Sequence, residues 1–131
     1  MQGITDHMLA ADLGEGVRHL DRDHADMMSL AAQFSRLRER ALHRQAVAVL
    51  AELLATAEAH WRREVDMLRS YGYPEADDHA AGHLATEQAL AALATTPAEV
   101  ATGCEDVILR MLIEDQRWKW WFLDAGIRPR A

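Results

Sequence analysis

The sequence has one cysteine, no long apolar run and no segment typical of a secretion signal. A single cysteine, Cys104, excludes an intrachain disulfide framework and is typical of a reducing compartment, so we expect a cytoplasmic protein. No stretch approaches the roughly 18 apolar residues that a membrane span needs, and the first residues lack the basic and apolar regions of a signal peptide. We therefore expect no membrane partner.

Helix breakers are also scarce. Only three prolines and seven glycines occur among 131 residues, whereas the helix formers Ala, Leu, Glu and Arg are abundant. Half of the residues are apolar, which is enough to bury a core in a chain of this length. We expect an all-α fold in which residues 1–131 form one domain.

The chain lacks a surplus of basic residues. Its formal net charge is −7 at pH 7, whereas a protein that binds nucleic acid needs a basic face to displace counterions from phosphate. Four arginines between positions 36 and 44 form a local cluster, which we interpret as a solvated helix end. We expect no nucleic-acid partner.

Apolar residues recur at intervals of three and four along four segments, which is the pattern of amphipathic helices. The first segment starts loosely around Gly14 and Gly16 and continues to about Leu37. The second runs from about Ala46 to Leu68 and ends at the sequence "YGYP", whose glycine and proline break helices.

The third and fourth segments carry signals for the start of a helix. Asp77 and Asp78 suit a helix N-terminus, because their charges oppose the helix dipole. In "TPAE", Thr96 can cap a helix that begins at Pro97, and Glu99 would complete a capping box. Four helices with short connections predict an up-down-up-down four-helix bundle.

Histidines and a glutamate form two i, i+4 pairs in "HWRREVDMLRSYGYPEADDHAAGH", residues 60–83. His60 with Glu64, and His79 with His83, each point the same way on a helix and can chelate one ion. His24 projects into the same core from the first helix. Burying polar groups unpaired costs about 2 to 7 kcal/mol each, so a metal centre is favoured. These residue types suit iron, manganese or zinc and do not choose among them.

The stretches "GVRHLDRDH", "HWRREVDMLRSYGYP" and "HAAGH" resemble, in order and spacing, motifs of the hemerythrin family, especially its bacterial members. The resemblance covers most of the chain. It implies a four-helix bundle with two non-haem iron ions that binds dioxygen reversibly. By this resemblance His24 and His60 would bind one iron. His79 and His83 would bind the other, and Glu64 would bridge the two.

The fourth helix departs from the family, which there has a histidine followed five residues later by a bridging aspartate. No histidine follows His83 in this chain. If Asp115 replaces the histidine, Trp120 replaces the aspartate; if Asp115 is the aspartate, Arg110 stands where the histidine was. Asp115 lies about 30° to 40° from the centre of the apolar stripe, so we prefer the second alternative. The rival carboxylate, Glu114, shares an expected exposed, ion-paired face with Arg110.

Apolar side chains near the expected centre are candidates for the wall of an oxygen pocket. They are Met28, Trp61, Met111 and Trp118. Trp120 lies nearly opposite Trp118 on the same helix, so we expect it to be exposed, which indicates a partner surface or a dimer contact. The oligomeric state is left open.

Three classes of function follow from these residues. The first is a non-haem di-iron protein that carries, stores or senses dioxygen or another small diatomic or peroxide ligand. The second is an oxidase or peroxidase enzyme that uses the coordination position opened by the missing histidine. The third is a metal-binding bundle without catalysis.

Overall fold

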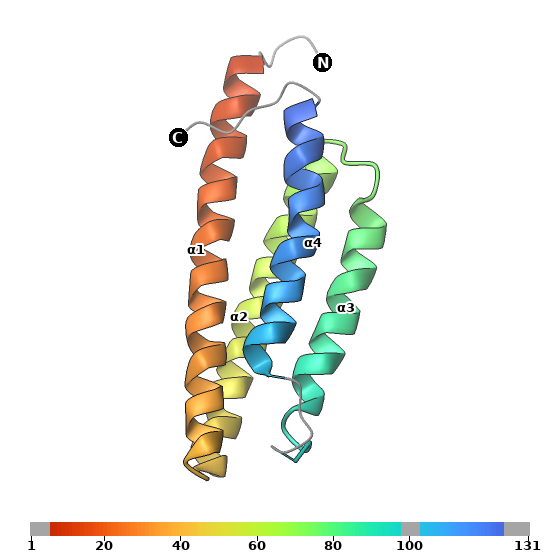
Figure 1. Cartoon of the computed structure of the whole chain (residues 1–131). Helices are drawn as coiled ribbons and strands as arrows, with labels where there is room; N and C mark the ends of the chain where they lie inside the picture. Colours follow the sequence, from red (N-terminus) through yellow and green to blue (C-terminus); the bar gives the residue numbers. More distant parts are fainter. Residues whose placement is uncertain (1–5, 98–102, 125–131) are drawn as a thin grey trace.

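Figure 1 shows the computed structural model of the chain, which describes residues 6–97 and 103–124. It contains four helices, α1 (Asp6–Glu39), α2 (His43–Ser70), α3 (Ala76–Ala92) and α4 (Cys104–Asp124), and no strand in those two ranges. The expected all-α fold is therefore confirmed. No helix in the described part of the chain is long and apolar enough to cross a bilayer.

Helix α1 begins earlier than the sequence predicts. It starts at Asp6 and passes without a break through Gly14 and Gly16, so the expected loose start is wrong. A glycine inside a helix costs about 1 kcal/mol relative to alanine, which tertiary contacts can offset. Position 16 favours glycine because α1 packs closely on α2 there: an added Cβ would lie 3.2 Å from the sulfur of Met67.

Helix α2 ends at the predicted sequence "YGYP". The N–H of Tyr73 donates to the carbonyl of Leu68 (2.9 Å), and the N–H of Gly72 donates to that of Arg69 (3.1 Å). These two bonds define a Schellman turn. Gly72 has φ +76°, which glycine adopts without the steric cost of a Cβ atom. The turn leads into α3, which begins at Ala76 as the neighbouring aspartates predict.

Helix α1 ends in the same type of turn, with alanine where α2 has glycine. The N–H of Leu42 donates to the carbonyl of Leu37 (2.9 Å), and that of Ala41 to the carbonyl of Arg38 (3.0 Å). Ala41 has φ +57°. This left-handed conformation costs a residue with a Cβ roughly 1 to 2 kcal/mol, so the turn is strained.

We expect Ala41→Gly to raise the free energy of unfolding by about 1 kcal/mol and Gly72→Ala to lower it by a similar amount. Both effects come from the backbone, because a Cβ at position 72 would meet no atom within 4 Å. Urea unfolding followed by circular dichroism measures both. A loss of stability in Ala41→Gly would contradict the strain at this turn.

Helix α4 begins later than the sequence predicts. It starts at Cys104, whereas Thr96 and Pro97 lie outside any helix, so the expected start at Pro97 is wrong. The Thr96 hydroxyl instead donates to the carbonyl of Ala92 (2.6 Å) at the end of α3, which also accepts the backbone N–H of Thr96 (3.1 Å). Glu99, the other half of the expected capping box, lies outside the described residues.

The four helices lie side by side and bury two apolar clusters (Figure 1). Helix α1 packs on α2 and α4, and α3 packs on the same two helices. The larger cluster contains Met27, Phe34, Leu53, Trp61, Leu90, Ile108 and Met111; the smaller contains Leu20, Leu68, Trp118 and Phe122. Buried polar residues separate them along the chain, as in α4, where Asp115 lies between Met111 and Trp118.

Candidate metal centre

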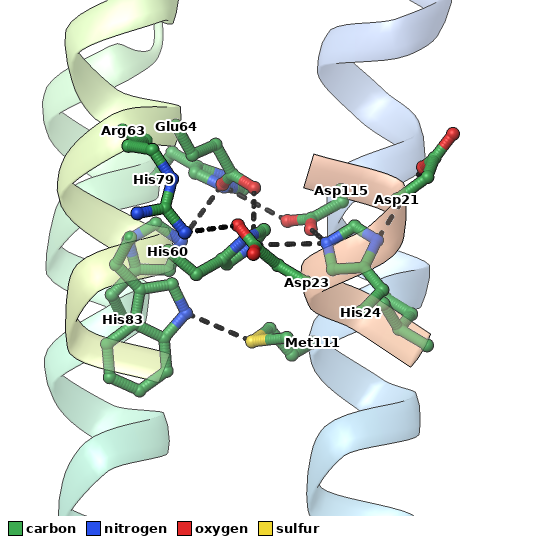
Figure 2. A network of polar contacts seen from close by, with 12 residues as sticks. Asp21, Asp23, His24, His60, Arg63, Glu64, His79, His83, Met111 and Asp115 are labelled. Carbon is green, nitrogen blue, oxygen red and sulfur yellow. Dashed lines mark hydrogen bonds and ion pairs between the residues drawn. The ribbon is translucent and has the colours of Figure 1, made fainter. Parts of the chain in front are cut away.

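The six candidate ligands meet between the four helices (Figure 2). They are His24 of α1, His60 and Glu64 of α2, His79 and His83 of α3, and Asp115 of α4. No side chain among them is more than 10% exposed. Every helix thus contributes at least one polar side chain to one buried cluster.

The ligand atoms fall into two groups, and within each group they all lie within 4.8 Å of one another. One group contains His24 and His60, and the other contains His79 and His83. Glu64 and Asp115 belong to both groups. Two histidine pairs that share two carboxylates are suited to two cations joined by carboxylate bridges.

Glu64 directs one oxygen to each histidine pair. Its Oε2 lies 3.2 Å from Nε2 of His60, whereas its Oε1 lies 3.1 Å from Nε2 of His83 and also contacts His79. The side chain is fully buried. Glu64 follows His60 by four residues in α2, so the two side chains lie on the same face of the helix, as the sequence predicts.

Asp115 mirrors this arrangement from the opposite helix. Its Oδ1 lies 3.1 Å from Nε2 of His79 and its Oδ2 lies 3.0 Å from Nε2 of His24. Asp115 is 1% exposed, whereas the side chain of Glu114 is 61% exposed and pairs with Arg117 at 3.6 Å. The expected orientations of the two carboxylates are therefore confirmed; that Asp115 binds metal stays a prediction.

Three buried carboxylate oxygens of the cluster lack hydrogen bonds in the described part of the chain and are suited to contact cations. Oε2 of Glu64 and both carboxylate oxygens of Asp115 have no hydrogen-bond partner among the described residues, although each lies within 3.2 Å of an imidazole nitrogen. In addition, Nε2 of His24 and Nε2 of His60 face each other at 3.1 Å. Buried polar atoms without partners are costly, and a cation within each group would satisfy all of these atoms.

The charges of the cluster act on one another. Burial lowers the pKa of His79, but Asp115 and Glu64 outweigh it and raise that pKa to about 9. Burial also lowers the pKa of His60, but Glu64 and Asp23 raise it above its usual value. Burial raises the pKa of Glu64, but its contacts with His60, His79 and His83 lower it well below its usual value. Metal binding would thus release protons from the histidines.

Asp23 holds the candidate ligand His60 in place from outside the two groups. Its Oδ2 accepts a hydrogen bond from Nδ1 of His60 (3.1 Å) and another from Arg63 (Figure 2). A proton on Nδ1 leaves the lone pair of His60 on Nε2, which faces the cluster. The sequence motifs did not single out Asp23, although "DRDH" places it next to His24 and so about 100° around α1, towards α2.

We expect Asp23→Ala to weaken metal binding by about 10- to 100-fold, because partners of ligating histidines have effects of that size. Chelator competition under argon measures the affinity. Asp26→Ala is the matched control, since Asp26 is an exposed aspartate of the same helix. Equal affinities of the two variants would contradict a positioning role for Asp23.

The candidate oxygen-pocket residues separate into two sets. Trp61 stacks on His83 with ring centroids 5.1 Å apart, and its indole N–H donates to the sulfur of Met111 (3.0 Å). Met28 packs against the same larger cluster. Trp118 instead belongs to the smaller cluster, beyond Asp115 along α4. An apolar wall at the centre is thus formed by Trp61 and Met111.

A cavity of about 240 Å³ opens between α3 and α4. Its wall includes His79, His83 and Asp115, and also Arg110. The volume is enough for about eight water molecules. Arg110, which occupies the place of the missing histidine in the preferred alternative, is exposed and borders this cavity. The second histidine pair is therefore accessible to small molecules from this side.

Comparison of the chain with family models, with curated proteins and with solved structures gave no match. The resemblance to hemerythrins stays a prediction, and the metal centre is inferred from the positions of the six side chains.

Proposed function

We propose that this protein is a non-haem di-iron protein of the hemerythrin type that binds dioxygen. One observation carries the proposal: two buried histidine pairs share the same two carboxylates, whose oxygens mostly lack hydrogen-bond partners. Imidazole and carboxylate without thiolate suit iron. The ligands would be His24 and His60 for one ion, His79 and His83 for the other, and Glu64 and Asp115 as bridges.

The course of the chain supports an up-down-up-down bundle around this centre. In Figure 1 each helix after the first runs back alongside the one before it. Ligands on facing helices are the usual way in which such bundles build metal sites. When bound, a pair of ferrous ions would supply the electrons that dioxygen binding needs.

The chain's own residues have two tasks in this proposal. Trp61 stacks on the candidate ligand His83 and donates its indole N–H to the Met111 sulfur, so these two side chains place apolar surface beside the centre. The cavity beside His79, whose wall includes Met111, gives a small ligand a way in. A buried centre beside a cavity of this kind is accessible to a diatomic ligand.

Anaerobic loading with ferrous iron, followed by exposure to air, tests this function. We expect two iron ions per chain and a change in visible absorption that reverses under argon. Protein loaded with zinc is the control and should show no optical change. Absence of any optical change in the iron-loaded protein would overturn the proposal.

The cavity favours a second candidate, an oxidase or peroxidase. With Arg110 in place of a histidine, the ion at His79 and His83 would have one imidazole fewer than the family resemblance implies, and this side faces the cavity. Sustained consumption of dioxygen or peroxide in the presence of a reductant would favour the enzyme, whereas one stoichiometric change would favour the carrier. Arg110→His returns an imidazole to the cavity wall and should lower any turnover.

Metal analysis of the protein as purified separates both candidates from a bundle that binds metal without reacting. Two iron ions per chain support a di-iron protein. Zinc, or a single ion per chain, would support the third class.

A further inference from the structure

The outer face of α4 carries an exposed apolar stripe. Leu109, Ile113, Trp120 and Leu123 are 48%, 62%, 65% and 44% exposed, and the exposed Gln116 lies between them. We call these five residues the α4 seam. Figure 1 shows α4 between α1 and α3, with the side away from the core not covered by another described helix. Large apolar side chains gathered on one exposed face indicate an interaction surface.

The spacing of the seam is that of a coiled coil. Successive members are four, three, four and three residues apart, which places Leu109, Gln116 and Leu123 at position d of a heptad and Ile113 and Trp120 at position a. At 1.5 Å per residue the seam spans about 21 Å of α4. The residues that α4 buries in its own bundle are a different set, so this helix has two contact faces.

We propose that the α4 seam is the interface of a symmetric dimer, in which α4 of two copies of this chain pack in parallel. The residues beside the seam complement one another in this arrangement. In a parallel pair, position g of one helix faces position e of the next heptad on its partner. Glu105 then faces the partner's Arg110, and Lys119 faces the partner's Asp124. Both contacts join opposite charges, and the two-fold axis forms each of them twice.

The contacts at position g hold these charges at the edge of the seam. The hydroxyl of Ser35 donates to Glu105, and Lys119 pairs with Asp21 at 3.2 Å. Ser35 and Asp21 both belong to α1. The charged side chains of Glu105 and Lys119 are therefore already held along the edge that the partner's e positions would contact.

An antiparallel pair brings arginines at position e together. Pairing position a with position d in that orientation brings e opposite e. Arg117 then meets either the partner's Arg110 or the partner's Arg117, depending on the alignment, and like charges repel. Gln116 also favours a parallel pair. At a core position it lies opposite Gln116 of the partner subunit, and a hydrogen bond between the two side chains would fix the alignment of the helices.

Sedimentation equilibrium of the full chain tests the interface. We expect a dimer whose dissociation constant rises at least about 30-fold in Ile113→Glu and in Trp120→Glu, because a buried aromatic or aliphatic anchor carries much of such an interface. The matched control is Leu84→Glu, which changes a leucine of α3 that is 57% exposed. Circular dichroism checks that each variant is folded.

A cysteine crosslink tests the orientation. Leu123→Cys brings two d positions together in the parallel dimer and should form a disulfide between copies, whereas Leu84→Cys should not. The native Cys104 is 2% exposed and does not compete. A monomer in sedimentation, a dimer that survives both seam variants, or a dimer without the crosslink at position 123 would each overturn the proposal.

Discussion

Glu64→Ala is expected to remove both ions from the proposed centre. We expect the iron content after anaerobic loading to fall from two ions per chain to nearly none, with an affinity at least about 100-fold weaker, because a ligand matters more than the partner of a ligand. The reason is geometric: Glu64 directs one oxygen to each histidine pair and is fully buried. Iron per chain is measured after removal of unbound metal.

The control for this variant is Glu58→Ala. Glu58 is a glutamate of the same helix, but its side chain is 55% exposed and pairs with Arg62 at 2.7 Å. It should keep both ions. Two ions in Glu64→Ala would contradict the bridge, and the loss of one ion only would assign Glu64 to a single histidine pair.

The second large effect separates two neighbouring carboxylates. We expect Asp115→Ala to lose both ions, as Glu64→Ala does, and Glu114→Ala to retain them at unchanged affinity. Asp115 has an oxygen within 3.1 Å of an imidazole nitrogen from each pair, whereas the side chain of Glu114 lies outside with Arg117. Iron analysis of the two variants, prepared side by side, measures the difference.

The comparison of Asp115→Ala with Glu114→Ala has its own internal control, because each variant removes one carboxylate from the same turn of α4. Any general effect of lower negative charge on this helix appears in both. Equal retention of both ions in the two variants would show that neither carboxylate is needed as a ligand and would overturn the assignment of Asp115.

Much of the cluster could be predicted from the sequence because its candidate ligands repeat with the period of a helix. Residues four apart on a helix share a face, and this spacing alone pairs His60 with Glu64 and His79 with His83. The same rotation of about 100° per residue distinguishes Asp115 from Glu114. Such arguments need only one helix at a time.

The features that the sequence did not predict depend on contacts between helices. The carboxylate of Asp23 contacts His60 and Arg63 because of the way α1 is rotated about its axis. The hydrophobic period of α1 alone does not give that rotation. The start of α4 depends on whether the Thr96 hydroxyl caps α4 or bonds back to α3, and the residue type permits either use. Gly16 stays helical because Met67 packs against it.

Two of the four tryptophans lie at the regions for which we make proposals, Trp61 at the candidate metal centre and Trp120 on the α4 seam. Trp61 stacks on a candidate ligand, His83, so its fluorescence is expected to be quenched when iron binds. Trp120 lies on the α4 seam and is 65% exposed, so its emission should shift to shorter wavelength when two copies associate. The intensity of Trp61 emission is therefore expected to respond to metal loading, and the wavelength of Trp120 emission to association.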